Sequence, residues 1–298
     1  MLTSPVIGAE TITIGDDLTV GRIGYGAMQL TGPNVWGEYP DHDSGVALLR
    51  HVVESGVTFI DTADVYGPHS NELLIREALH PYAEDLVIAT KGGFVRGGPA
   101  VESLDAVGNP NYLRQCVYMS LRRLGREQID LYYLHSGRAT DAPFADQVAV
   151  LAELREQGLV RHIGLSNVTV DQFDAARSIV EIAAITAQYN LGSRVGAPIL
   201  AAAERANVVF SPWGPTRFVG PDAERIRDEV GRIARRHGAT PHQVALAWHL
   251  HRSPNSLPIP GTVTPEYVTQ NVAAADLELS GDDVRFLTHL APEGGRTA

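Results

Sequence analysis

The sequence predicts an α/β fold, a single (β/α)8 TIM barrel, and three observations lead to this prediction. Short β-branched or aromatic runs alternate with longer stretches of helical periodicity almost to the C-terminus. No internal repeat, linker or low-complexity segment interrupts this alternation. The length of 298 residues equals about two average domains but is also ordinary for one barrel of this kind. We therefore expect one domain over residues 1–298.

The first runs do not belong to this alternation. Residues 11–14 and 18–20 are short β-prone runs, and Gly15-Asp16-Asp17 between them has the composition of a tight turn. We expect an N-terminal β-hairpin that lies outside the main sheet.

Eight predicted strands follow the hairpin, each a short apolar or β-branched run. They lie near residues 22–26, 57–61, 86–90, 129–134, 161–165, 184–188, 207–211 and 257–259. In a barrel of parallel strands, the carboxyl ends of the strands form the face that carries the active site. Polar residues at these ends are therefore the first candidates for function.

Helical periodicity fills the gaps between the strands. Val46, Leu49 and Val53 recur at i, i+3 and i+7, and Asp43 or Ser44 is the expected helix cap. Further helices are expected from Asn109-Pro110 to Gly125, across Leu151 and Leu154 to Gly158, over 222–237 and over 241–252. Additional helices are expected beyond the last strand.

Composition limits the class of protein and its partners. The net charge of −11 argues against nucleic acid or an acidic membrane as the main partner, because both require clustered Lys and Arg. Cys116 is the single cysteine, so we expect neither a disulfide framework nor a cysteine-based zinc site, and no other metal site is expected. Residues 1–5 have no signal-peptide character, and no apolar run approaches the length of a membrane span. We expect a cytoplasmic protein; the sequence does not give its oligomeric state.

Lysine usage provides the first sign of chemistry. The chain has 24 basic residues, of which 23 are arginines and one is Lys91. Lys91 follows the third predicted strand, where a compact ammonium can lower the pKa of a neighbouring phenol in a tight pocket. A stray lysine would more commonly occupy an exposed helix, so the strand-end position favours a functional role.

Three more polar residues are predicted to lie at the same end of the barrel. Asp61 ends the second strand, Tyr66 follows in the same loop, and His135 follows the fourth strand. Taken one at a time, these residues would be interpreted as a capping aspartate, a packed tyrosine and a structural histidine. Their coincidence with Lys91 indicates a catalytic site.

With these residues in place, the sequence resembles the aldo-keto reductases. Asp61, Tyr66, Lys91 and His135 look like the catalytic tetrad of that family. Other family-like phrases follow in order: Gly164-Leu165-Ser166-Asn167, Gln188-Tyr189-Asn190, Phe210-Ser211-Pro212, Ile259-Pro260-Gly261-Thr262 and Gln270-Asn271. The resemblance implies reduction of an aldehyde or ketone carbonyl by NAD(P)H, with Tyr66 as general acid, Lys91 lowering its pKa and His135 orienting the substrate oxygen.

The resemblance also implies a cofactor site across the barrel mouth. Ser166, Asn167 and Gln188 would hold the carboxamide, and Phe210 would stack on the nicotinamide. The remaining cofactor candidates are Ser211, Trp213, Arg217, Gly261, Thr262, Thr264, Gln270 and Asn271. NADPH is the expected cofactor, with NADH as the alternative because residues 257–275 contain no Lys or Arg to bind a 2′-phosphate.

The resemblance implies that the substrate is a small carbonyl compound. Aromatic and apolar residues of the loops after strands one, three and seven are expected to form the pocket: Met28, Trp36, Tyr39, Phe94 and Trp213. The phrases Gly26-Ala27-Met28-Gln29-Leu30 and Tyr66-Gly67-Pro68-His69 are similar to a bacterial branch that includes pyridoxal reductases, so a pyridoxal-like or other aromatic aldehyde is one candidate substrate. The alternatives are an imine or ketone reductase of a biosynthetic pathway and a non-catalytic, cofactor-sensing binding protein of the same fold.

Overall fold

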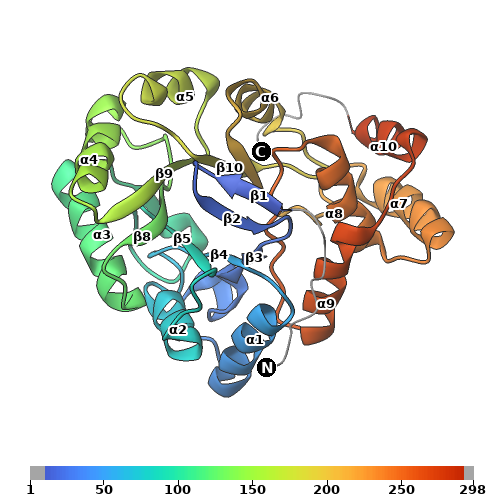
Figure 1. Ribbon diagram of the computed structural model, residues 1–298, viewed down its shortest axis with the longest axis horizontal. Helices are drawn as coiled ribbons and strands as arrows, with labels where there is room; N and C mark the ends of the chain where they lie inside the picture. Colours follow the sequence, from blue (N-terminus) through green and yellow to red (C-terminus); the bar gives the residue numbers. More distant parts are fainter. Residues whose placement is uncertain (1–10, 292–298) are drawn as a thin grey trace.

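The computed structural model describes residues 11–291, and within them a parallel sheet of seven strands curves into a barrel (Figure 1). The expected hairpin and main alternation are confirmed, whereas residues 1–5 lie outside the described part. In spatial order the barrel strands are β11 (Val209–Trp213), β10 (Ala184–Gln188), β9 (Val160–Ser166), β8 (Ile129–Leu134), β5 (Val87–Gly92), β4 (Phe59–Asp61) and β3 (Tyr25–Gly26).

Helices surround the strands on the outside of the barrel (Figure 1). They are α1 (His42–Glu54), α2 (Ser70–Leu79), α3 (Pro110–Leu124), α4 (Phe144–Glu156), α5 (Val170–Arg177), α6 (Ala197–Ala206), α7 (Ala223–His237), α8 (Pro241–Arg252), α9 (Pro265–Ala273) and α10 (Gly281–Thr288). Short 3₁₀ turns are η1 (Ala27–Gln29), η2 (Pro33–Val35), η3 (Val101–Ser103) and η4 (Ala274–Asp276). The cap of α1 is Asp41, whose side chain accepts from the Ser44 N–H, rather than Asp43 or Ser44 as predicted. No helix of the described chain has both the length and the apolar character needed to cross a membrane.

The eighth predicted strand, 257–259, is not a regular strand, although its segment occupies the gap in the barrel. Its backbone bonds to β11 on one side, where Phe210 donates to Asn255 and Leu257 donates to Phe210. On the other side Gly24 and Gly26 donate to the carbonyls of two prolines, Pro258 and Pro260. Proline has no N–H to return such a bond, so a regular ladder cannot form here.

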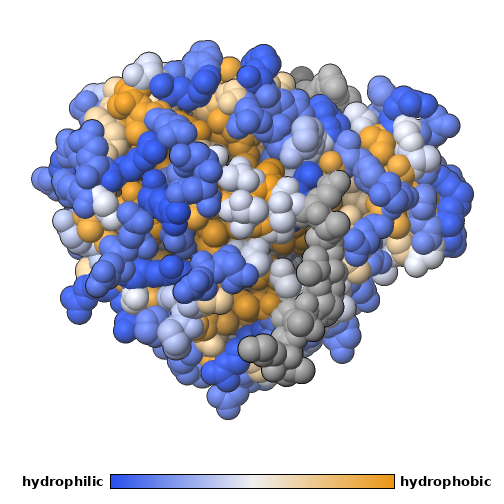
Figure 2. Space-filling model, viewed as in Figure 1, coloured by the Kyte–Doolittle hydropathy of each residue, from blue (hydrophilic) through white to orange (hydrophobic). Residues whose placement is uncertain are grey.

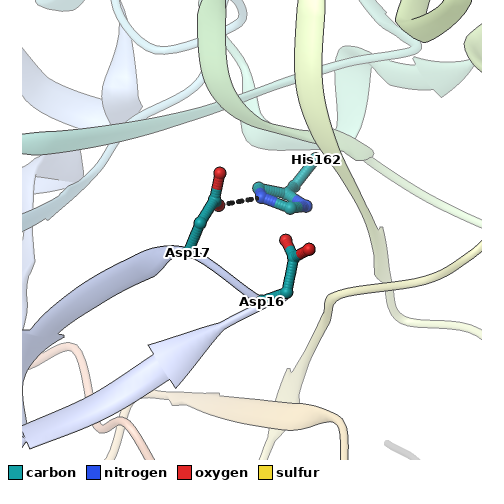
Figure 3. A group of neighbouring side chains, drawn as sticks. All are labelled: Asp16, Asp17 and His162. Atoms are coloured by element: carbon teal, nitrogen blue, oxygen red, sulfur yellow. Dashed lines mark hydrogen bonds and ion pairs between the residues drawn. The ribbon is translucent and has the colours of Figure 1, made fainter.

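The N-terminal hairpin covers the barrel at the end where the strands begin. Strands β1 (Thr11–Ile14) and β2 (Leu18–Gly21) pair antiparallel, and Figure 1 shows them across the centre of the barrel. The turn carries Asp16 and Asp17 close to the buried ring of His162 on β9 (Figure 3). Asp17 bonds to His162 at 2.7 Å and accepts from the Arg161 guanidinium, so these contacts hold the hairpin against the barrel.

A second hairpin, which the sequence did not predict, follows the strand that carries Lys91. Strands β6 (Phe94–Arg96) and β7 (Leu104–Ala106) pair antiparallel in a segment expected to be a loop. The sequence pattern of these two strands is weak, because each strand has three residues and the segment that connects them is rich in Gly and Pro.

Period-two alternation along the strands divides the core into two layers. Inward side chains such as Phe59, Ala89, Leu131 and Tyr133 fill the barrel together with residues of the hairpin. Outward side chains pack beneath the helices. In Figure 2 the outer helices present mainly hydrophilic residues, and apolar residues are visible in the seams between them.

Candidate active site

Three neighbouring strands bring polar side chains to the barrel mouth. Asp61 ends β4, Lys91 lies near the end of β5, and His135 directly follows β8. The His135 N–H donates to the carbonyl of Gly92 at 2.9 Å, which extends the ladder between these strands by one step. Because β4, β5 and β8 are adjacent in the sheet, the spacing predicted from the sequence becomes a spatial cluster.

Lys91 is buried, with 3% of its surface exposed, and forms an ion pair with Asp61. Its Nζ donates to Asp61 Oδ1 at 2.5 Å and to the carbonyl of Thr62 at 2.8 Å. Burial lowers the pKa of Lys91, but Asp61 and the Tyr66 hydroxyl outweigh it and hold this pKa above its usual value. The ammonium therefore stays charged at neutral pH.

Tyr66 lies beside this ammonium in the loop after β4. Its ring centroid is 5.3 Å from Lys91 Nζ. Burial raises the pKa of Tyr66, Lys91 lowers it, and Asp61 raises it again, so the net direction is upward. This differs from the net lowering that the sequence predicts, because desolvation and the Asp61 carboxylate outweigh the effect of the lysine. Tyr66 is consequently protonated at neutral pH, the state in which it can donate.

His135 is buried at the edge of the same site. Its ring makes edge-to-face contacts with Phe94, at 4.7 Å between centroids, and with Tyr66, at 6.1 Å. Burial and then the charge of Lys91 hold the pKa of His135 well below its usual value. The imidazole is therefore neutral, as predicted, and its Nδ1 has no hydrogen-bond partner among the described residues.

Sequence reasoning missed Tyr133, which lies against Lys91 from inside the barrel. The centroid of its buried ring is 5.8 Å from Lys91 Nζ, and its hydroxyl has the Ser211 hydroxyl as a hydrogen-bonding neighbour. The available signal was its position two residues before His135, since residues i and i+2 of a strand face the same side. Lys91 is thus enclosed between two tyrosine rings.

The residues expected to hold a carboxamide lie at the ends of β9 and β10. Asn167 has a left-handed φ of 52°, and its side chain joins two other candidates. It donates to Ser166 Oγ and accepts from the Trp213 ring N–H, both at 3.0 Å. The Gln188 side chain is half-buried and makes no hydrogen bond within the described chain, so its amide is free for a ligand.

Phe210 does not reach this site, which corrects the role expected for it. It is fully buried among the helix-facing residues and contacts Tyr189, with ring centroids 6.0 Å apart. Ser211 and Trp213, one and three positions on, point to the barrel interior. Trp213 packs on the inner core, so it is the aromatic residue that this strand offers at the mouth.

The remaining cofactor candidates lie after β11, in the segment before α9 and on α9 itself. Thr262 Oγ1 accepts from the N–H of Thr264, the residue that precedes α9. Arg217 is exposed and lies close to Gly214, beyond the end of β11. Gly261, Gln270 and Asn271 are each partly exposed.

The pocket candidates divide into two groups. Trp36 and Phe94 lie in the segments around Tyr66 and His135, and Met28 is half-buried in η1. Tyr39 instead packs on the helix-facing core of α1 and α2, which corrects its expected place in the pocket wall.

Comparison with known proteins gives a consistent result. The model of the aldo/keto reductase family matches residues 22–291. An "uncharacterized oxidoreductase" of Schizosaccharomyces pombe is 42% identical over 276 residues, covering 92% of this chain and 87% of that protein. Pyridoxine 4-dehydrogenase of Escherichia coli is 39% identical over 292 residues, covering 96% and 100%.

Solved structures agree with these relatives. A glycerol dehydrogenase of Gluconobacter oxydans has a TM-score of 0.84 at 26% identity, with 94% of each chain covered. An aldo/keto reductase of Klebsiella pneumoniae in complex with NADP and acetate has a TM-score of 0.79 at 25% identity, with 97% of each chain covered. The chain therefore belongs to the aldo/keto reductase family and is an oxidoreductase.

Proposed function

We propose that this enzyme reduces an aldehyde or ketone to an alcohol, with NADPH as hydride donor and Tyr66 as proton donor. The observation that carries the proposal is the state of Lys91. The only lysine of the chain is buried, paired with Asp61, and lies beside the Tyr66 ring. Burying a charge is costly unless it is paired, so this arrangement indicates a role that an exposed arginine could not fill.

The residues at the mouth fit a nicotinamide cofactor. Ser211 Oγ is buried, and apart from the neighbouring Tyr133 hydroxyl it has no hydrogen-bond partner in the described chain; the Gln188 amide is free. Such groups favour a polar ligand at the mouth. Bound NADPH would supply the hydride, and the relative from Klebsiella pneumoniae in complex with NADP supports this choice. The threonines near the N-terminus of α9 and the exposed Arg217 are the candidates for binding phosphate.

Each catalytic side chain then has a distinct task. Tyr66 gives its proton to the carbonyl oxygen, and Lys91 stabilises the phenolate that this leaves. Asp61 keeps Lys91 charged and fixed in place. Neutral His135 donates a hydrogen bond that orients the substrate oxygen. Hydride at the carbon and a proton at the oxygen complete the alcohol.

An aromatic aldehyde of the pyridoxal type is the substrate that we propose to test first. Pyridoxine 4-dehydrogenase is similar to this chain over nearly its whole length. The aromatic rings of Trp36, Phe94 and Trp213 near the mouth suit a flat ring. Small ketones and cyclic imines are the comparison substrates.

Replacing Tyr66 tests the proposal directly. Tyr66→Phe removes one hydroxyl, so kcat for carbonyl reduction should fall by about two to four orders of magnitude, the usual contribution of a general acid. NADPH binding, measured by fluorescence titration, should change by less than about threefold, because the hydroxyl serves the chemical step. NADPH should bind more tightly than NADH.

Tyr118→Phe is the matched control, because Tyr118 is exposed on α3 and should leave kcat unchanged. Wild-type turnover in Tyr66→Phe would refute the assignment of the acid. Cofactor binding without turnover on any carbonyl or imine, in the wild-type protein, would favour the non-catalytic alternative.

A further inference from the structure

The segment from 33 to 37, which we call the strap, lies against the Tyr66 loop in a strained conformation. Asn34 and Val35 both have φ of 58°, in the left-handed region. Asparagine tolerates this region, but a β-branched residue there is an outlier. Such a conformation persists only where surrounding contacts hold it. Besides the hydroxyl of Ser70, which donates to the Gly37 carbonyl at 3.0 Å, two contacts tie the strap to the proposed site.

The first contact is with the loop that carries the proposed acid. Gly67, the residue after Tyr66, donates its N–H to the Val35 carbonyl at 3.1 Å. In return the Gly37 N–H donates to the Gly67 carbonyl, also at 3.1 Å. The strap and the Tyr66 loop therefore fix each other through backbone atoms.

The second contact is a single guanidinium. Arg96 ends β6, and within the described chain it pairs with no carboxylate. Its three nitrogens donate to backbone carbonyls at distances between 3.2 and 3.4 Å. The accepting residues are Asn34 and Val35 in the strap, and Gly98, Pro99 and Ala100 in the turn of the second hairpin. A guanidinium is suited to this because its donors are held in a rigid plane.

The two segments joined by Arg96 lie on either side of the site. On the strap, the Trp36 ring centroid is 5.4 Å from the centre of the guanidinium. On the hairpin, Phe94 packs edge-to-face on His135. Arg96 thus connects a residue next to the proposed oxygen-binding histidine with a strap bonded to the residue after Tyr66.

We propose that Arg96 is a positioning and specificity-determining residue that clamps the strained strap onto the hairpin and closes this side of the pocket against bulky carbonyl substrates. The inference rests on the proposed carbonyl reduction for its kinetic consequence. The clamp itself is independent of turnover. Arg96 acts through Trp36 and the strap rather than on the reacting atoms.

Hydrogen exchange tests the clamp without any assay of activity. Arg96→Met keeps an unbranched apolar stem in place of the aliphatic part of arginine and removes every donor, so the strap should open more often. We expect the amides of Gly37 and Gly67 to exchange about tenfold faster or more, because local opening sets their protection. Arg232→Met, at an exposed position on α7, is the control and should leave these amides unchanged. Unchanged exchange in Arg96→Met would overturn the clamp.

Kinetics test its role in specificity. In Arg96→Met, KM for a small aldehyde should rise about tenfold while kcat stays within about threefold. The variant loses contacts that hold the substrate equally in the ground state and the transition state, so binding weakens and the chemical step is little changed. The preference for small over bulky aldehydes should shrink. An equal loss of kcat for both substrates with the preference intact would contradict the proposal.

A second variant tests whether the left-handed backbone strain at Val35 drives opening of the strap. Val35→Asn places a residue that accepts the left-handed region and keeps the same backbone carbonyl. Added to Arg96→Met, it should restore part of the slow exchange and part of the substrate preference; no recovery would show that strain does not drive the opening. If the wild-type protein reduces no carbonyl at all, the proposed function fails, whereas the exchange data still decide the clamp.

Discussion

Asp64 is a buried carboxyl group that the proposed chemistry does not use, although it lies two residues before Tyr66. Its side chain is 2% exposed, and its Oδ1 has no hydrogen-bond partner in the described chain. Burial, and then the neighbouring Glu72, raise the pKa of Asp64 from 3.8 to about 7. At mildly acidic pH the folded protein therefore keeps a proton here that the unfolded chain has already lost.

This difference predicts the pH dependence of stability. Between about pH 4 and pH 7 the unfolded state binds fewer protons at Asp64, so the free energy of unfolding falls as pH rises and levels off above 7. Asp64→Asn removes the titration, so it should gain stability relative to wild type by an amount on the order of a few kcal/mol between pH 4 and pH 8. Urea denaturation at both pH values measures this. Asp228→Asn, on the exposed face of α7, should show no such change, and an equal effect of Asp64→Asn at both pH values would contradict the prediction.

At the scale of elements, Asp17 adds polar contacts to the N-terminal hairpin, whose residues Ile14, Leu18 and Val20 are already buried in the inner core. Arg161 and His162 both bond to its carboxylate; burial raises the pKa of Asp17, but the contact with His162 and then that with Arg161 outweigh it and lower this pKa. Asp17→Asn should destabilise the protein by about 1 kcal/mol at pH 7, the scale of a partly exposed charged hydrogen bond. The difference should shrink as pH falls below about 4, where the unfolded chain becomes protonated, and vanish once pH falls through the lowered pKa of Asp17 in the folded protein.

Thermal unfolding and hydrogen exchange across residues 11–21 measure this effect. Asp16→Asn is the matched control, because the neighbouring Asp16 is exposed and forms no hydrogen bond within the described chain. Equal destabilisation by both variants would show that the charge of the turn, rather than the Asp17 contacts, holds the hairpin.

The precision with which strand ends can be located determines which site residues the sequence predicts correctly. Asp61, Lys91 and His135 could be placed because each follows a long enough run for its strand end to be located. Phe210 could not, because the predicted strand 207–211 is actually Val209–Trp213, and in a strand only the parity of a position relative to the barrel decides which side chain faces inward. The hairpin at Phe94 and the strap at Val35 depend on contacts between distant segments, such as those of Arg96, which no local pattern contains.

At the scale of the whole molecule, the chain carries two unique reporters, one lysine and one cysteine. Lys91 lies inside the barrel mouth, and Cys116 lies on α3 in the helix-facing layer; 3% and 6% of their surfaces are exposed. The contacts of Lys91 come from β4, the Tyr66 loop and β8, so exposing it requires either these strands to separate or the loop to move. An amine reagent and a thiol reagent therefore probe opening of the barrel from its two sides.

We expect both residues to be modified at least about a hundredfold more slowly in the native protein than in the unfolded chain, because each requires an opening that costs much of the folding free energy. Their modification rates should rise with urea along the same slope, as they would if the inner and outer layers unfold together. Peptide mass spectrometry after timed labelling measures both rates in one sample. Fast labelling of Lys91 with a shallow slope, beside slow and steep labelling of Cys116, would show instead that the mouth opens locally, by movement of the Tyr66 loop and the strap, while the helix layer stays closed.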